Sequence, residues 1–276
     1  MIDMLTVLAI SILAGFLGAL TGLGGGSIMT PILVEFGVPV KYAIAASMVT
    51  IIATSSGSAA SYVKERITNV KAAFYLEMFT ITGAIVGATI TAFIQPRLLY
   101  FFFAAFLLTS FYGLSGHLKE DFPKAVKQDR FSKWLELHGS YYDQAARKQV
   151  KYKMTNAHLG GLGMLVAGLA AGMLGIGAGA FKVSVHELIL KMPSKVSSTT
   201  SNFIIGITAL AGASVYFASG LLFVGLAAPM AVGTTVGAVV GGRLLNRFPN
   251  RFIRYLFLII VFVLVVQMLY KGITLQ

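Results

Sequence analysis

The chain has no cysteine among its 276 residues, and only 12% of them are charged. The lack of cysteine excludes a disulfide framework, a thiolate metal site and any thiol-relay mechanism. The scarcity of charge, beside a hydrophobic fraction of 57%, is typical of polytopic membrane proteins. In a soluble protein the net charge of +12 would suggest a nucleic-acid partner. Here the bias of basic residues toward one membrane face is the simpler cause, so we expect a lipid bilayer and no nucleic acid.

Motifs for common enzymatic chemistry are missing as well. The glycine runs lack the third glycine of a dinucleotide-binding loop and the Gly-Lys-Ser/Thr of a phosphate-binding loop. No pair among the four histidines has metal-ligand spacing, and no Ser/His or paired-carboxylate set recurs at the glycine runs. We therefore expect a protein that is not an enzyme and that holds neither a metal nor a cofactor.

What the sequence does contain is a duplicated, glycine-rich interruption of an apolar run. Four glycines in Gly22–Gly26 separate the apolar stretches Met4–Leu20 and Ser27–Phe36. Because each glycine inside a helix costs roughly 1 kcal/mol relative to alanine, such a run should break a helix. Ala14–Gly26 matches Ala167–Gly179 at a constant offset of 153. The chain is therefore predicted to be a duplication built around two broken helices.

The repeats are completed by apolar runs of spanning length after each break, at 42–62, 72–93 and 98–114, and again at 196–217, 222–245 and 252–270. We expect a first transmembrane repeat over 1–115, a polar linker over 116–156 and a second repeat over 157–276. Pro39-Val-Lys41 matches Pro193-Ser-Lys195 at offset 154. Within the linker, Phe131, Trp134 and Leu135 predict an amphipathic surface helix.

The distribution of basic residues predicts the topology. If each broken helix crossed the membrane, the side with the linker would carry thirteen Lys/Arg and the other side nine. If each break instead forms a hairpin that enters and leaves on one side, the counts become nineteen and three. The hairpin arrangement agrees better with the positive-inside rule. We therefore expect an all-α polytopic membrane protein of two inverted repeats, each a broken-helix hairpin plus three transmembrane helices, with the linker cytoplasmic.

The two half-helices, predicted over 27–36 and 180–190, are too short to span a bilayer. About ten residues of helix reach ~15 Å, half of a ~30 Å hydrocarbon core, so both N-termini should lie near the middle of the membrane. Inverted repeats with broken helices at the midplane are the architecture of secondary transporters. A helix N-terminus presents N–H groups and a partial positive charge, so two facing termini would form an anion-binding cage.

Residues at the breaks and at the start of the helix after each break are the candidate ligand contacts. They are Gly22, Gly24, Gly25, Gly26, Ser27, Ser47, Gly175, Gly177, Gly179, Lys182, Thr200, Ser201 and Asn202. For the serines, threonines and the asparagine, the competing interpretation is helix–helix hydrogen bonding and close packing.

Four ionisable residues lie in or near the apolar segments, where such residues are usually functional. Lys182 is one turn beyond the second break and either reaches toward the cage or extends to the surface. Glu77 either carries a coupling proton or is an interfacial residue near Lys71. His186 and Glu187 could pair with Lys191 as a surface feature.

The glycine runs also resemble a known family. Gly22-Leu-Gly-Gly-Gly-Ser followed by Pro31, its echo Gly175-Ile-Gly-Ala-Gly, and Pro-Xaa-Lys before a Ser/Thr-rich helix are similar to the sulfite exporter TauE/SafE family of membrane permeases (TSUP type). The resemblance covers roughly residues 5–115 and 157–270 and excludes the linker. It implies a multi-pass transporter of the bacterial inner membrane, involved in sulfur metabolism, that carries sulfite, sulfonates or related organosulfur anions. Ser184, where the first half has Pro31, departs from the fuller pattern.

Three functions compete for this sequence. The first is export of sulfite or a small organosulfonate by alternating access, possible without a coupling ion because an inside-negative potential of 100 mV supplies about 2.3 kcal/mol per exported charge. The others are an anion channel with the cage as its filter, and proton-coupled import with Glu77 as the carrier. A homodimer is compatible with each.

Overall fold

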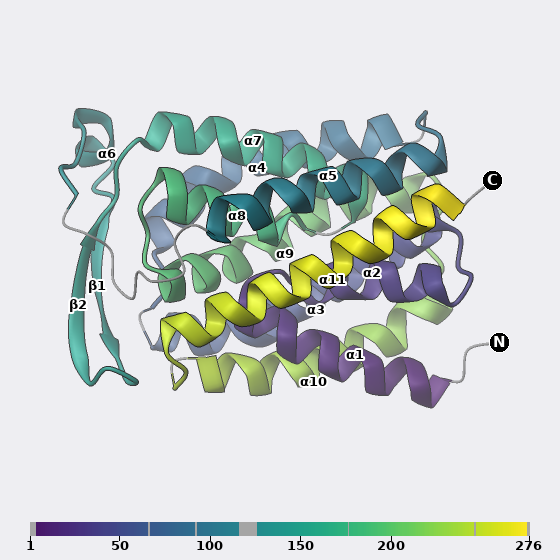
Figure 1. The fold of residues 1–276 in the computed structure, drawn as a ribbon, viewed down its shortest axis with the longest axis horizontal. Coiled ribbons are helices and arrows are strands. Elements are labelled where there is room, and N and C mark those ends of the chain that lie inside the picture. Colours follow the sequence, from purple (N-terminus) through teal and green to yellow (C-terminus); the bar gives the residue numbers. More distant parts are fainter. Residues whose placement is uncertain are drawn as a thin grey trace.

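The computed structural model describes residues 4–65, 67–91, 93–115, 126–175, 177–245 and 247–274. In the first half a helix ends in the glycine run, a short helix begins there, and three long helices follow (Figure 1). These are α1 (Met4–Thr21), α2 (Gly25–Glu35), α3 (Val40–Lys64), α4 (Val70–Thr91) and α5 (Pro96–Ser115). The helices lie within a few residues of the apolar runs that predict them.

The second half repeats this plan with one difference in the half-helix. Its elements are α7 (Ala157–Leu174), α8 (Gly179–Ser184), the π-helix η1 (Val185–Ile189), α9 (Ser194–Ala218), α10 (Val224–Leu245) and α11 (Asn250–Thr274). The sequence predicted a single α-helix over 180–190. Instead, six α-helical residues are continued by five with the wider π-helical hydrogen bonding. Such turns are rare and occur frequently at functional sites.

Six of the described helices are long and apolar enough to cross a membrane, namely α3, α4, α7, α9, α10 and α11. Helices α1 and α5 contain shorter apolar stretches, Leu5–Thr21 and Pro96–Thr109. The prediction of an all-α polytopic membrane protein is therefore confirmed. By length α7 also qualifies as a span, although the sequence predicted it to be one arm of a hairpin.

Close contacts through glycine join the two halves in a reciprocal way. Helix α1 packs along α10, and its counterpart α7 packs along α4. A Cβ atom built on Gly15 would lie 2.2 Å from the carbonyl oxygen of Thr234, and one built on Gly168 would lie 2.2 Å from that of Thr80. Only glycine allows these backbones to approach so closely. The contacts recur at the sequence offsets, so the duplication is also a duplication of packing.

Two buried tyrosines show the same reciprocity. The Tyr62 hydroxyl of α3 donates to the carbonyl of Ala19 at 2.8 Å, and the Tyr216 hydroxyl of α9 donates to the carbonyl of Gly172 at 2.7 Å. Each tyrosine thereby binds a carbonyl near the C-terminal end of a broken helix. Such carbonyls have no partner within their own helix, so each needs one from outside.

The described part of the linker, residues 126–156, contains more regular structure than the sequence predicted. The predicted amphipathic helix is present only as α6 (Arg130–Trp134), and it is followed by an antiparallel hairpin of β1 (His138–Asp143) and β2 (Lys148–Lys153) that was not foreseen. Asp129 caps α6. Burial acts to raise the pKa of its carboxyl, but hydrogen bonds from Ser132, Asn156 and Thr155 outweigh this and lower the pKa to about 2.

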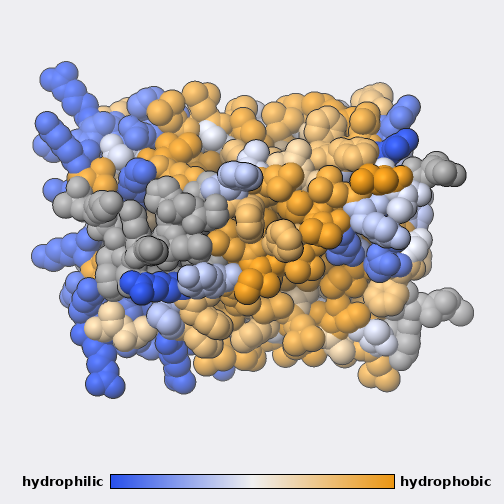
Figure 2. Space-filling view, viewed as in Figure 1, coloured by the Kyte–Doolittle hydropathy of each residue, from blue (hydrophilic) through white to orange (hydrophobic). Residues whose placement is uncertain are grey.

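The molecule has two polar ends and an apolar middle. Both termini lie at one end, and α6 with the β-hairpin lies at the other (Figure 1). The visible face shows hydrophobic residues between blue, hydrophilic ends (Figure 2). Lys71 pairs with Glu136 at the hairpin end, and Lys271 pairs with Glu35 at the terminal end. These two lysines lie at the ends that the hairpin arrangement assigns to them, and Arg66 lies outside the described residues. Lys182, which that arrangement counts on the linker side, is buried in the interior, so the inverted arrangement stays a prediction.

Candidate functional site

Each helix break is made by left-handed backbone that favours glycine. After α1, the φ angles are +77° at Gly22 and +76° at Gly24. After α7, they are +64° at Gly175 and +59° at Gly177, and Ala178 follows at +50°. A left-handed alanine is strained, and such residues persist only where the surrounding structure holds them. The predicted positions of both breaks are therefore correct.

The two breaks touch each other. A Cβ atom built on Gly179, the first residue of α8, would lie 2.2 Å from the carbonyl oxygen of Gly22. The Thr30 hydroxyl of α2 lies 3.4 Å from the carbonyl oxygen of Gly175. The sequence predicted that the two half-helix N-termini face each other and form an anion-binding cage. At Gly22 and Gly179 the two backbones are in direct contact, and the cage itself stays a prediction.

Side chains of α9 bind the carbonyls at the end of α1. Ser201 donates to the carbonyl of Gly22 at 3.0 Å and Asn202 donates to that of Ala19 at 2.7 Å. These two candidates thus lie at the first break, where they satisfy carbonyls that α1 leaves unpaired. Thr200 faces another element, since its hydroxyl accepts a hydrogen bond from the Asn69 N–H at the start of α4.

Two of the candidate residues carry buried polar atoms with no hydrogen-bond partner among the described residues. These atoms are Ser47 Oγ and Asn202 Oδ1. Ser47 lies beside the start of α2, where a Cβ atom on Gly26 would be 2.5 Å from the Ser47 carbonyl oxygen. An unsatisfied buried polar atom costs about 1–3 kcal/mol. A ligand that binds in another conformation would supply each atom with the missing hydrogen-bond partner.

The remaining candidates of the first break have partners nearby. The Gly25 N–H donates to Thr54 Oγ1 at 3.3 Å, and the Ser27 hydroxyl donates to the Leu23 carbonyl at 2.6 Å. Gly24 and Gly177 both face Ile205 of α9, with built Cβ atoms at 3.1 Å and 2.5 Å from its side chain. These candidates lie at the breaks, whereas Thr200 contacts the start of α4.

Lys182 is buried and contacts side chains of α4 and α9. Its side chain has no exposed surface, and its Nζ lies 3.6 Å from Glu77 Oε2 and 2.5 Å from Thr208 Oγ1. Thr208 in turn donates to Glu77 Oε1 at 2.6 Å. The interpretation of Lys182 as a surface residue is therefore wrong, and so is that of Glu77 as an interfacial residue near Lys71, because Glu77 is 3% exposed. The two ionisable candidates are instead partners.

His186 is also buried, so its interpretation as a surface feature with Lys191 is wrong. Its Nδ1 lies 3.4 Å from the Ser197 carbonyl oxygen, and its Nε2 has no partner among the described residues. Glu187, the next residue, lines a small cleft instead.

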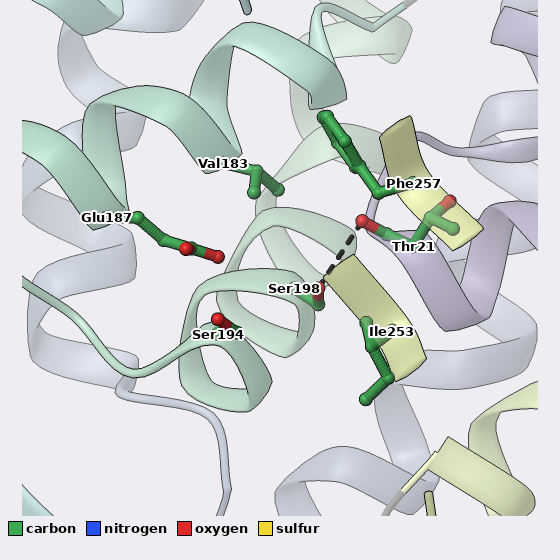
Figure 3. Close-up of a pocket in the computed structure, with 7 residues that line it drawn as sticks. All are labelled: Thr21, Val183, Glu187, Ser194, Ser198, Ile253 and Phe257. Carbon is green, nitrogen blue, oxygen red and sulfur yellow. Dashed lines mark hydrogen bonds between the residues drawn. The ribbon is translucent and has the colours of Figure 1, made fainter. Parts of the chain in front are cut away.

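That cleft, of about 190 Å³ including its open part, lies beside the first break (Figure 3). It is lined by Thr21, Val183, Glu187, Ser194, Ser198, Ile253 and Phe257. Ser198 points across it to the Thr21 carbonyl, to which its hydroxyl donates at 3.3 Å (Figure 3). Among the described lining residues, Glu187 is the one charged side chain.

Sequence reasoning missed the ion pair between the linker and α9. Lys195 Nζ lies 2.8 Å from Asp143 Oδ1, and both side chains are buried. Lys195 belongs to the Pro-Xaa-Lys motif, whereas Asp143 ends β1 of the linker. No periodicity in the sequence signals this pair, because it joins segments 52 residues apart.

The fold and the paired breaks define a polytopic membrane protein of the kind that moves small solutes. The family model described as sulfite exporter TauE/SafE matches residues 7–268, so the chain belongs to this family. A similar protein is the probable membrane transporter protein YunE of Bacillus subtilis (strain 168), which is 26% identical over 225 residues, 78% of each chain. No solved structure matches the chain. The chain is thus a membrane transporter of this family, as the glycine motifs indicated.

Proposed function

We propose that the protein exports sulfite or a small organosulfonate anion across the bacterial inner membrane by alternating access. The observation that carries this proposal is the contact between the two helix breaks, at Gly179 and Gly22. In a conformation in which the breaks separate, the N-terminal ends of α2 and of the α8–η1 segment face one cavity. Ser47 Oγ, unsatisfied in the packed state, then gains a partner in the anion.

The packed contact favours a carrier over a channel. A channel needs a path that is open across the membrane, whereas the breaks here meet backbone to backbone. Separation and closure of the breaks in each cycle limit the rate of transport.

Flux measurements in proteoliposomes test the proposal. We expect uptake of labelled sulfite to saturate with concentration and to be inhibited by unlabelled sulfite or a small sulfonate. A flux that rises linearly to high concentration would instead identify a channel. A thermal-shift series with sulfite, sulfate, thiosulfate, sulfoacetate and taurine identifies the preferred anion, and no stabilisation by any of them would count against the sulfur-anion class.

The proposed orientation places the linker in the cytoplasm and both termini outside. Ser140 in β1 and Thr274 in α11 are both exposed. Because the chain has no cysteine, each can be replaced by a single cysteine. In intact cells, an impermeant thiol reagent should label Thr274→Cys and leave Ser140→Cys unlabelled. Equal labelling of the two positions would contradict the inverted arrangement.

A further inference from the structure

The buried cluster around Glu77 is a connected hydrogen-bond network from three helices. Lys182 of α8 donates to Thr208 of α9, and Thr208 donates to Glu77 Oε1 of α4. Thr80, one turn after Glu77, donates to the second carboxylate oxygen at 2.5 Å. All four side chains are buried. Both carboxylate oxygens and the ammonium are therefore held in one network.

The network has few other charges near it. The buried acidic and basic residues described on α4, α5, α7, α8, η1 and α9 are Glu77, Lys182, His186 and Lys195. His186 lies one turn after Lys182, and Lys195 is paired with Asp143. Glu187 faces the cleft instead. With the carboxylate and the ammonium both charged, the network is neutral. Isolated charge is costly in such an environment, so any change in its charge must be compensated.

The other half of the repeat has no charged pair at the corresponding positions. At the repeat offsets, Lys182 and Glu77 correspond to Met29 and Ala231 in the other half, whereas Thr208 and Thr80 correspond to Thr54 and Thr234. Those two threonines flank Gly25, which donates to Thr54 and whose built Cβ would lie 3.2 Å from Thr234 Cγ2. The hydroxyls are thus common to both halves, and the charges are an addition to one.

We infer that this pair couples transport to protons: Glu77 takes up one proton when the anion binds, and Lys182 then carries the charge opposite the anion. The inference rests on the proposed function, and it concerns the ion coupling of that same transport.

The charge balance defines the cycle. In the resting state the Lys182 ammonium neutralises the Glu77 carboxylate. An anion that approaches Lys182 competes with this carboxylate and would leave the network with one excess negative charge. A proton from the aqueous phase then binds a carboxylate oxygen, and the neutral carboxyl group no longer holds the ammonium. The loaded network contains ammonium, anion and carboxylic acid, so a monoanion is carried without net charge.

Proton uptake on binding is the direct test. Purified protein in weakly buffered detergent solution is mixed with sulfite, at a pH at which it is the dianion, and separately with methanesulfonate, whose single charge does not change with pH. We expect about one proton taken up from solution for each anion bound. Binding of either probe without proton uptake would overturn the inference.

Variants separate the roles of the two residues. Glu77→Gln should still bind the probe but take up no proton, and its binding should lose the pH dependence of the wild type. Lys182→Met should bind roughly a hundredfold more weakly or worse. The surface double variant Lys71→Met, Glu136→Gln is the matched control and should retain both binding and proton uptake.

A neutral double variant distinguishes a loss of function from a loss of folding. Glu77→Gln combined with Lys182→Met leaves no unpaired charge, so its thermal midpoint should equal or exceed that of the wild type. Its transport should be lost. Transport at the wild-type rate would overturn the inference, and so would a large drop in thermal midpoint, which would identify a purely structural pair.

The two proposals fail in different ways. If the wild type transports neither sulfite nor methanesulfonate, the proposed function fails. If it transports either probe and the internal pH of the vesicles does not change with the flux, the proposed function stands and the coupling is wrong. A coupled, neutral cycle also predicts that methanesulfonate flux responds to an imposed pH gradient and not to a potassium diffusion potential.

Discussion

The two helix breaks are alike in backbone and different in chemistry. Each has two glycines with positive φ, and each is followed by a half-helix with hydroxyls of neighbouring helices beside it. At the first, the neutral side chain of Met29 is buried, and the Ser11 hydroxyl lies 3.9 Å from its sulfur. At the second, the corresponding Lys182 is paired with Glu77. The same backbone arrangement therefore accommodates either a neutral or a charged side chain at this position. The charged pair is specific to the second half.

The half-helices that follow the two breaks also differ, and the second is the more irregular. Helix α2 is regular α-helix over Gly25–Glu35 with Pro31 inside it, whereas α8 changes into the π-helix η1 after Ser184. Ala178 is left-handed where its counterpart Gly25 is the first residue of a helix. The second break thus combines the buried charges, the strained alanine and the π-helix. Strain and irregular helix cluster at functional sites, which supports a division of labour between the halves.

The largest expected loss of stability comes from replacing the charged Lys182 by the methionine found at the corresponding position of the first half. Lys182→Met leaves the buried Glu77 carboxylate without its partner, which typically costs about 3–5 kcal/mol in free energy of unfolding. Met29→Leu, the matched change in the neutral half, conserves volume and should cost less than about 1.5 kcal/mol. Thermal unfolding in detergent compares the two. Equal midpoints would mean that the charged pair contributes nothing that the neutral packing lacks.

A smaller loss is expected where the two breaks touch. Gly179→Ala would place a methyl group against the Gly22 backbone, and overpacking of this kind costs about 1–3 kcal/mol or more. Gly37→Ala is the control, because Gly37 has φ +83° but no neighbour within 4 Å of a built Cβ atom. Its loss comes from backbone strain alone, about 1–2 kcal/mol. A smaller decrease in thermal midpoint for Gly179→Ala than for Gly37→Ala would contradict this prediction.

The smallest effect tests whether the halves are energetically alike where their structures agree. Tyr62→Phe and Tyr216→Phe each remove one hydroxyl that donates to a carbonyl at the end of a broken helix. Tyr216→Phe should cost about 1–3 kcal/mol, because the buried Gly172 carbonyl loses this donor. Tyr62→Phe should cost less, because the Ala19 carbonyl also accepts a hydrogen bond from Asn202 at 2.7 Å. Equal losses of unfolding free energy for the two variants would contradict this prediction.

Much of the fold could be predicted from the sequence because its signals are local. Long apolar runs give the spans, and glycines such as Gly24 and Gly177 give the breaks, since both depend on neighbouring residues only. The internal repeat added a long-range statement, that Gly22 and Gly175 play equivalent roles. It did so without any knowledge of contacts.

The features that the sequence did not predict are the directions in which side chains point and the residues that they contact. Lys182 is placed one turn beyond the break by the sequence, but helix periodicity alone does not say that its side chain turns toward α4. The run that contains Thr200 and Ser201 reads as one patch, yet consecutive residues of a helix point about 100° apart, so one faces Asn69 and the other faces Gly22.

The β-hairpin was missed for a similar reason. Its buried side chains, Tyr141, Val150 and Tyr152, alternate with exposed ones over strands of only six residues each. They pack on residues near the start of α4, such as Ile67 and Ala72, so their apolar partners lie far away in the chain. A short alternation of this kind, in a segment rich in lysine, gives no strong signal of its own.

The hairpin also gives the two ends of the molecule unequal stiffness. At its end, the buried pair of Asp143 and Lys195 ties the linker to α9, and Asn69 ties the start of α4 to Tyr152. At the other end, the pair of Lys271 and Glu35 is partly exposed, with 22% and 58% of the side-chain surface accessible. Breaking a buried pair costs about 3–5 kcal/mol, whereas an exposed pair contributes about 0–1 kcal/mol. We therefore expect the helices to separate more readily at the end that holds the termini, and amide hydrogen exchange to be faster in its outermost helical turns than in those beneath the hairpin.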